Sequence, residues 1–109
     1  MVTVAEFRAI AMELPEVTEA PHFEKTSFRI ANKIFATLNI AENRATIKLP
    51  EAAQDLFCLN KKLMVPVPNK WGKQGWTHID LSEIPLEMCS DAVKTSYLEV
   101  APKRLKLNL

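Results

Sequence analysis

Both glycines and both tryptophans of this 109-residue chain lie within one six-residue segment, Trp71-Gly72-Lys73-Gln74-Gly75-Trp76. Glycine adopts backbone conformations with positive φ and lets another backbone approach closely, so we expect the unusual backbone of the chain here. The two indole rings, with Lys70 and Lys73 beside them, combine aromatic surface with positive charge. We therefore predict that any recognition surface of the chain includes this segment.

The length and composition are typical of one soluble globular domain covering residues 1–109. Hydrophobic residues make up 48% of the chain and charged residues 25%, as in ordinary globular proteins. No segment has the pattern of a signal peptide, and no apolar run approaches the roughly 20 residues that cross a bilayer. We therefore expect a cytoplasmic protein without a membrane partner, present as a monomer or a weak homodimer.

The residue types that usually carry chemistry are scattered. Cys58 and Cys89 lie far apart among apolar neighbours, which is typical of reduced core cysteines. His22 and His78 lack zinc-ligand spacing. A general base at His22 is conceivable, but a hydrogen bond that orders its loop is the preferred interpretation. The sequence offers no nucleophile–base pair or Gly-rich phosphate loop, so we expect no enzyme, no metal and no cofactor.

The net charge of +1 hides an uneven distribution. Residues 56–79, which include the tryptophan segment, carry four lysines and no acidic residue. Residues 101–109 carry Lys103 and Arg104 among their bases and again no acidic residue. Local positive potential attracts phosphates and acidic partners. Both zones are therefore candidates for phosphate contacts, although the second also fits a solvated helix end.

The N-terminal part predicts a helix and then a loop. Thr3 and Glu6 form a capping box, apolar residues follow at helical spacing, and Pro15 ends the helix. Residues 16–24 are predicted to be a loop because they contain Pro21 and an acidic bias. The acidic residues of this region are sparse and interrupted by apolar ones, so a solvated loop is preferred over a metal-binding edge.

Three strands are predicted next. The first begins at Phe28, and Ala31-Asn32 forms a two-residue turn into the second, because asparagine tolerates the left-handed region. Residues 41–43 form another turn before the third strand. Strict alternation predicts two faces. The inward set is Ile34, Ala36, Leu38, Ala45, Ile47 and Leu49, and the outward set includes Phe35, Thr37, Thr46 and Lys48.

The C-terminal half predicts a short helix, two strands and a long helix. The short helix begins at Pro50 and ends near Leu59, with Ala53, Leu56 and Phe57 buried. Residues 63–67 look extended, but Pro66 and Pro68 donate no ladder bond, which predicts an edge strand or an irregular segment. Residues 76–81 alternate, with Thr77, Ile79 and Leu81 on one face and Trp76, His78 and Asp80 on the other. The last helix begins near Ser82 or Pro85 and ends at Pro102.

This order predicts an α+β fold of two layers, α-β(3)-α-β(2)-α, with a mostly antiparallel sheet and its helices packed on one face. The opposite face is expected to carry Phe35, Thr37, Thr46, Lys48, Trp76 and His78. Such a mixed surface is either a solvated sheet face or a recognition face or dimer interface. Within it, Trp76 can simply pack on the sheet while Trp71 closes a tight turn.

Several segments recur in an order known from one family. They are Ala20-Pro21-His22-Phe23-Glu24-Lys25, Ser27-Phe28-Arg29-Ile30, Lys33-Ile34-Phe35-Ala36-Thr37-Leu38, Lys48-Leu49-Pro50, Gly75-Trp76-Thr77 and Ala101-Pro102-Lys103-Arg104. With them the chain resembles, over nearly its whole length, the MmcQ/YjbR-like family of small bacterial proteins. The resemblance implies a fold like that of the bacterial frataxin homologue CyaY and of type III secretion chaperones.

The same family is labelled a double-wing DNA-binding domain, so the resemblance implies a non-catalytic DNA-binding protein. Combined with the charge pattern, it predicts nucleic-acid contacts from Lys70, Trp71, Lys73, Trp76, Lys103 and Arg104. Further contacts from the open sheet face are predicted for Phe35, Lys48 and His78. The alternative is a protein-interaction or chaperone-like module that holds a protein or peptide partner on the open sheet face.

Overall fold

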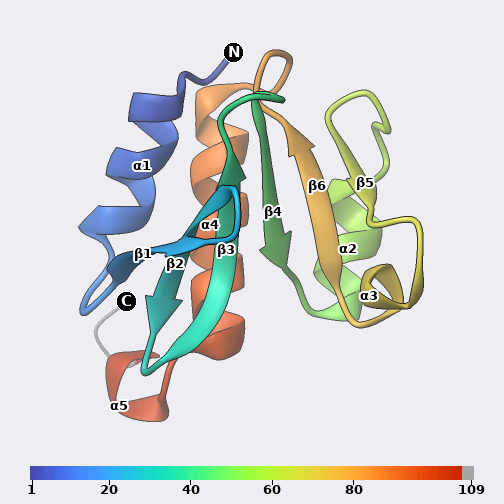
Figure 1. The fold of residues 1–109 in the computed structure, drawn as a ribbon. Helices are drawn as coiled ribbons and strands as arrows, with labels where there is room; N and C mark the ends of the chain where they lie inside the picture. Colours follow the sequence, from blue (N-terminus) through green and yellow to red (C-terminus); the bar gives the residue numbers. More distant parts are fainter. Residues whose placement is uncertain (107–109) are drawn as a thin grey trace.

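The computed structural model describes residues 1–106, whose six strands form one antiparallel sheet in the order β1-β2-β3-β4-β6-β5 (Figure 1). The α+β prediction is confirmed, with one more strand and two more short helices. The elements are α1 (Val4–Glu13), β1 (Thr18–His22), β2 (Lys25–Ile30), β3 (Lys33–Asn39), β4 (Arg44–Lys48), α2 (Glu51–Phe57), β5 (Met64–Pro66), α3 (Lys70–Lys73), β6 (Trp76–Asp80), α4 (Leu86–Val100) and α5 (Lys103–Lys106).

The predicted two-residue turn joins β2 to β3. Ala31 and Asn32 have φ of 51° and 66°, and positive φ at both central positions defines the type I′ turn that suits the twist of a hairpin. The β3–β4 turn also uses asparagines: Asn39 Oδ1 accepts the Glu42 N–H at 3.2 Å, and Asn43 has φ of 51°. In this nearly glycine-free chain, asparagines thus supply much of the turn geometry.

The loop predicted for residues 16–24 is wrong, because Thr18–His22 forms β1. This strand pairs antiparallel with β2, and the Ser27 hydroxyl also donates to the Ala20 carbonyl at 2.9 Å. Pro21 is tolerated because β1 lies at the edge of the sheet, where one side of the strand needs no ladder bonds. The edge position could not be inferred from the local pattern.

The prediction that Phe35 faces away from the helices is also wrong. Phe28 pairs with Ala36 but Arg29 pairs with Ile34, so β3 carries one extra residue, Phe35, opposite β2. Such a bulge interrupts the strict alternation of faces. Phe35 is fully buried, and its ring meets Tyr97 of α4 edge-to-face with centroids 5.8 Å apart. Ile34 therefore takes a place on the open face.

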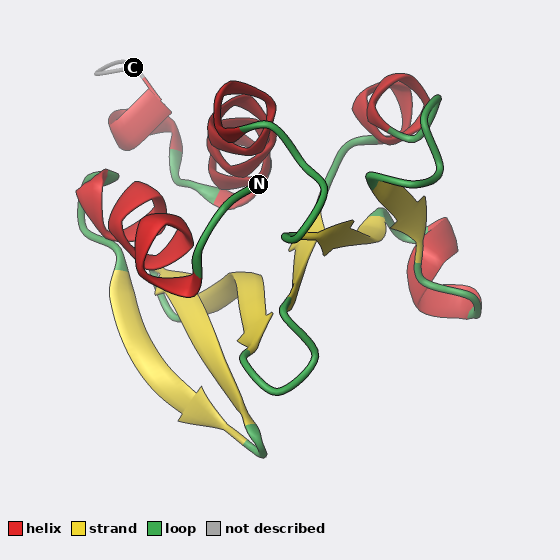
Figure 2. Cartoon of the chain, turned by 90° about the horizontal axis from the view of Figure 1, so that it is seen from above, coloured by secondary structure: helices red, strands yellow, loops and turns green. Residues whose placement is uncertain are grey.

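The core lies between the sheet and the helices α1 and α4, which cover the same face (Figure 2). Phe7 of α1 meets Phe28 of β2 edge-to-face at 5.8 Å. Where the β3–β4 ladder ends, the buried Ser96 hydroxyl donates to the Phe35 carbonyl at 2.8 Å and accepts the Lys48 N–H at 3.1 Å. Helix α4 therefore fixes the end of β4 as well as burying its own apolar stripe.

Helix α2 differs from its predicted packing. Leu56 is 66% exposed, whereas Gln54 is buried. Only Ala53 and Phe57 of the predicted stripe pack against the core. The reason is that α2 faces backbone carbonyls as well as the core, so a hydrogen-bond donor occupies its inner side.

The two cysteines are core residues, as predicted. Both are free and buried. Burial raises the pKa of Cys89 to about 12 and raises the pKa of Cys58 as well. Both thiols therefore stay protonated at neutral pH. None of the helices within residues 1–106 is long and apolar enough to cross a membrane.

Candidate functional site

The tryptophan segment forms α3 and the turn into β6. The Asn69 side chain accepts the Trp71 N–H at 2.8 Å and caps the short helix. A Cβ atom at Gly72 would lie 2.0 Å from the Val67 carbonyl oxygen, and one at Gly75 would lie 2.0 Å from the Leu49 oxygen. Gly75 also has φ of 106°. Both glycines therefore permit a close backbone approach, as expected. The expectation that unusual backbone is concentrated in this segment is wrong, because five residues outside it also have positive φ.

The buried side chain of Gln54 on α2 makes hydrogen bonds to this segment. Its Nε2 donates to the Gly72 carbonyl at 2.9 Å and lies 3.0 Å from the Thr77 hydroxyl oxygen. That hydroxyl in turn donates to the Gly75 carbonyl at 3.0 Å. Buried polar groups that satisfy one another hold a single geometry. The backbone that carries the two tryptophans is thus hydrogen-bonded to Gln54 of α2.

A groove of about 450 Å³ opens on the face of the sheet opposite α1 and α4. Figures 1 and 2 show two projections on this side, the β1–β2 hairpin and α3. We call the hollow the tryptophan groove, and it is defined by its lining residues, His22, Lys25, Ile34, Thr37, Thr46, Val67, Trp71, Trp76 and His78.

The two indoles differ in exposure. Trp71 is 50% exposed, and Lys70 Nζ lies 5.9 Å from its ring centroid in a cation–π arrangement. Trp76 is partly buried at the sheet end of the groove. Trp76 is thus the less exposed of the two rings, and Trp71 presents half of its surface to solvent. The groove therefore combines one anchored ring with one accessible ring next to a cation.

His78 is the polar centre of the groove. Its Nδ1 lies 2.8 Å from the Thr46 hydroxyl on the neighbouring strand. Desolvation lowers the pKa of His78 below its ordinary value of 6.5, and the positive charges of Arg44 and Lys25 act in the same direction, against Glu42. His78 is therefore neutral at pH 7 and offers one ring nitrogen as a donor and the other as an acceptor.

This lowered pKa predicts a loss of stability in mild acid. Below pH 6.5 the unfolded chain protonates His78 before the folded protein does, so the free energy of unfolding falls as the pH decreases from 7 towards 5.5. We expect His78→Gln, which can still bond Thr46, to lose this part of the pH dependence in urea unfolding. Equal pH dependence in both proteins would contradict the lowered pKa.

Comparison with known proteins identifies the family of this chain. The YjbR family model matches residues 12–99, which include every lining residue of the tryptophan groove. The chain belongs to the YjbR family. It is also similar to the crystal structure of the Deinococcus radiodurans protein DR2400, which has a DUF419 domain. The two share 26% sequence identity with a TM-score of 0.80, covering 100% of this chain and 90% of that one. A comparison with curated proteins gave no match.

Within the YjbR fold, six of the predicted site residues gather on one side of the molecule. Lys70, Trp71 and Lys73 lie on α3, and Lys73 is exposed. Trp76 and His78 lie on β6, where they pair across the strands with Lys48 and Thr46. Phe35 does not join them because of the bulge in β3.

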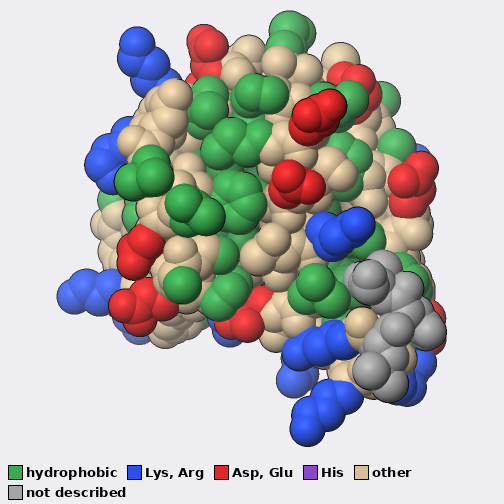
Figure 3. Space-filling view, turned by 180° about the vertical axis from the view of Figure 1, so that it is seen from behind, with side chains coloured by type: hydrophobic (Ala, Val, Ile, Leu, Met, Phe, Trp, Pro, Cys, Tyr) green, Lys and Arg blue, Asp and Glu red, His purple; other side chains and the backbone are tan. Residues whose placement is uncertain are grey.

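Lys103 and Arg104 belong to a different surface. They lie on α5, and neither lines the tryptophan groove. Figures 1 and 2 place α5 and α3 on opposite sides of the molecule, and Figure 3 shows Lys and Arg side chains gathered near α5 on the helical face. Contacts from α5 to a nucleic acid stay a prediction, and they would be made by a second surface.

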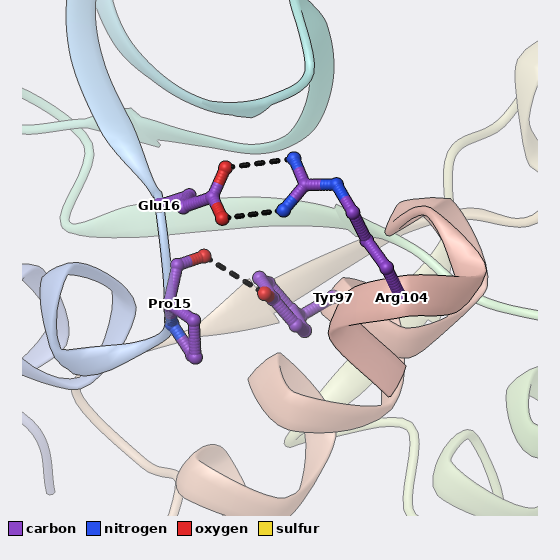
Figure 4. Close-up of polar contacts among 4 residues, drawn as sticks. All are labelled: Pro15, Glu16, Tyr97 and Arg104. Atoms are coloured by element: carbon purple, nitrogen blue, oxygen red, sulfur yellow. Dashed lines mark hydrogen bonds and ion pairs between the residues drawn. The ribbon is translucent and has the colours of Figure 1, made fainter. Parts of the chain in front are cut away.

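Arg104 already has a partner within the fold (Figure 4). Its guanidinium makes two hydrogen bonds to the Glu16 carboxylate, at 2.6 and 2.9 Å. These bonds hold the pKa of Glu16 below its ordinary value. Beside them the Tyr97 hydroxyl donates to the Pro15 carbonyl at 2.8 Å. Arg104 therefore joins α5 to the turn between α1 and β1.

Sequence reasoning missed the residues that the β1–β2 hairpin brings to the groove. Lys25 of this hairpin lines the groove and was not predicted as a contact, and the same holds for Ile34 of β3. Phe23, at the hairpin tip, is 94% exposed with φ of 59°, and its ring lies 4.9 Å from that of His22. The sequence signal for these residues was Pro21-His22-Phe23-Glu24-Lys25. It indicates a hairpin turn once residues 18–22 are recognised as a strand.

Proposed function

We propose that this YjbR-family protein binds DNA without catalysing a reaction, and that it takes unpaired bases into the tryptophan groove. The observation that carries the proposal is the half-exposed Trp71 ring, which lies at the groove beside the Lys70 ammonium group. Aromatic rings stack on bases of any sequence, and nearby lysines contact the phosphates between them. Trp71 and Lys70 bring both kinds of contact together on one side of the groove.

Single-stranded DNA fits this site better than a duplex. Bases in a duplex are stacked on one another, so an indole cannot reach their faces unless they are flipped out. A groove of about 450 Å³ falls within the size range of pockets for small molecules and can enclose an unpaired base. Because Nδ1 of the neutral His78 is bonded to Thr46, its Nε2 is the ring nitrogen left for the base edge, as a donor or an acceptor according to the tautomer.

A binding role is also consistent with the surroundings of the titratable groups. The His78 ring is bonded to a hydroxyl, and the His22 ring contacts Phe23 edge-to-face. Neither contact activates a nucleophile in the way that a carboxylate–histidine pair does. The protonated thiols of Cys58 and Cys89 are buried away from the groove lining.

Replacing Trp71 by alanine is expected to weaken the binding of a fluorescent ten-nucleotide oligothymidylate about 5-fold to 150-fold. The expectation follows from a stacking contribution of about 1–3 kcal/mol per base. Fluorescence anisotropy at low salt measures the dissociation constant, and circular dichroism checks the fold. Leu56→Ala removes another exposed apolar side chain that does not line the groove, and is the matched control.

Two results would refute the DNA proposal. One is a wild-type protein that binds no oligothymidylate at low salt. The other is Trp71→Ala binding as tightly as Leu56→Ala. An oligouridylate of the same length shows whether the groove prefers DNA over RNA, since the 2′-hydroxyl distinguishes the two.

The second candidate function is a protein-interaction module. Its support is the apolar character of part of the site, where Ile34 and Val67 line the groove and Phe23 projects nearby. These residues suit a hydrophobic peptide side chain. Salt separates the two candidates, because binding through phosphates weakens steeply as salt rises whereas apolar docking does not. Analytical ultracentrifugation and a pull-down test a second copy and other protein partners.

A further inference from the structure

The tryptophan groove is the middle one of three hollows along one strand pair. Strands β4 and β6 present three successive pairs of side chains on the open face, since alternate residues share a face. The pairs follow the strands in order and are Arg44 with Asp80, Thr46 with His78, and Lys48 with Trp76. One of these pairs lines each of the three hollows. Neighbouring hollows share the side chains of His78 or Trp76.

The first flanking hollow, which we call the Arg44 hollow, has a volume of about 430 Å³ and adjoins the groove at His78. Its cations are Arg44, Lys61 and Lys62, and its carboxylates are Glu42 and Asp80. Lys61 and Lys62 belong to residues 56–79, the segment that contains no acidic residue. The positive charges outnumber the negative ones.

The opposite flank, the Lys48 hollow, has a volume of about 520 Å³ and adjoins the groove at Ile34 and Trp76. Its cations are Arg29, Lys33 and Lys48, and Glu99 is its acidic residue. Positive charge again predominates. The sheet face therefore has a basic hollow on each side of an aromatic groove.

Most of these cations are not neutralised within the fold. No ion pair among residues 1–106 involves a lysine of either hollow. Arg44 pairs with Glu42 at 2.9 Å through Nη2, but its Nε is buried without a hydrogen-bond partner. Arg29 donates its Nε to the Ser27 hydroxyl at 3.1 Å and forms no ion pair within the same range. Donors thus remain for an anionic ligand in both hollows.

We propose that a single nucleic-acid strand lies along β4 and β6, with a base in the tryptophan groove and phosphates in both the Arg44 and the Lys48 hollows. The inference rests on the proposed function and extends it to the path and length of the ligand. Arg44 and Lys48 are four residues apart on one strand, which corresponds to about 13 Å. A strand that contacts both must therefore be longer than one nucleotide.

The salt dependence of binding tests the two phosphate sites. Each phosphate contact to a single strand contributes about 0.7 to the slope of log K against log salt concentration. For ten-nucleotide oligothymidylate we expect the double variant Lys61→Gln/Lys62→Gln to lower the magnitude of this slope by about 1.4, and Lys33→Gln by about 0.7. Lys94→Gln, on α4 and outside the three hollows, is the control and should leave the slope unchanged.

A length series tests the path. Affinity should rise several-fold from two-nucleotide to longer oligothymidylates, and the lysine variants should reduce that gain while the two-nucleotide ligand changes less. Wild-type slopes in both sets of lysine variants, with Trp71→Ala still weakening binding, would overturn the path but retain the groove. A wild-type protein that binds none of the oligonucleotides would instead refute the proposed function itself.

Discussion

Replacing Gly75 by alanine is expected to lower the free energy of unfolding by about 2–5 kcal/mol. The left-handed region costs a residue with a Cβ about 1–2 kcal/mol, and overpacking adds about 1–3 kcal/mol. Both apply here, because Gly75 has φ of 106° and its added Cβ would lie 2.0 Å from the Leu49 carbonyl oxygen. The backbone cannot yield freely, since the Leu49 N–H donates to the Gly75 carbonyl at 2.9 Å.

Urea unfolding monitored by circular dichroism measures this loss, with two variants for comparison. Gln74→Ala is an exposed neighbour with φ of −88° and should be nearly neutral. Gly72→Ala meets the Val67 carbonyl oxygen at the same 2.0 Å but without a positive φ, so it should fall between the two. If Gly75→Ala unfolds at the same urea concentration as Gln74→Ala, the close approach to Leu49 is refuted.

Phe35→Ala is expected to cost about 3–5 kcal/mol, the range for removing a buried phenylalanine ring. Phe35 is fully buried, and its edge-to-face contact with Tyr97 joins the bulge of β3 to α4. The hydrogen bond from Ser96 to the Phe35 carbonyl holds the backbone in place, so the cavity cannot simply collapse. This outcome separates the observed fold from strict alternation, which would place Phe35 on the open face.

Ile34→Ala is the companion measurement, because the bulge exchanges the roles of these two neighbours. Ile34 is only partly buried and lines the tryptophan groove, so its truncation should cost much less stability. Thermal and urea unfolding of both variants give the comparison. A Phe35→Ala protein as stable as Ile34→Ala would contradict the bulged register.

Much of the fold follows from local sequence. Asn32 tolerates positive φ and lies between two alternating runs. The β2–β3 hairpin can therefore be predicted without any tertiary information. The capping box at Thr3 and Glu6 is present in the structure. Strand β6 also keeps its predicted faces, with Thr77 and Ile79 buried. Each of these features depends on neighbours a few residues away.

The missed features depend on contacts between distant segments. Strand β1 contains Pro21 and is readable only once its place at the sheet edge is known. The bulge at Phe35 depends on the register with β2, which no periodicity within β3 reveals. Gln54 was missed for a similar reason, since its inward position is favoured by carbonyls of α3 and β6.

In the candidate site, too, features set by local sequence were predicted and features set by distant contacts were missed. The tryptophan segment was identified from composition, and its backbone is as constrained as the glycines indicated. The hairpin that supplies His22 and Lys25 to the groove was not predicted, because its first strand, β1, was interpreted as a loop. The two basic hollows likewise gather residues from separate parts of the chain.

The order of strands in the sheet also determines when its open face forms during folding. The β1–β2, β2–β3 and β3–β4 pairings join consecutive strands, whereas β4 pairs with β6 across about thirty residues that include α2, β5 and α3. Closing a longer loop costs more entropy, and non-local pairings slow folding. We therefore expect the local pairings of β1 to β4 to form before β4 pairs with β6. The surface proposed for a nucleic-acid strand can therefore form only after Asp80, the last residue of β6, has been synthesised.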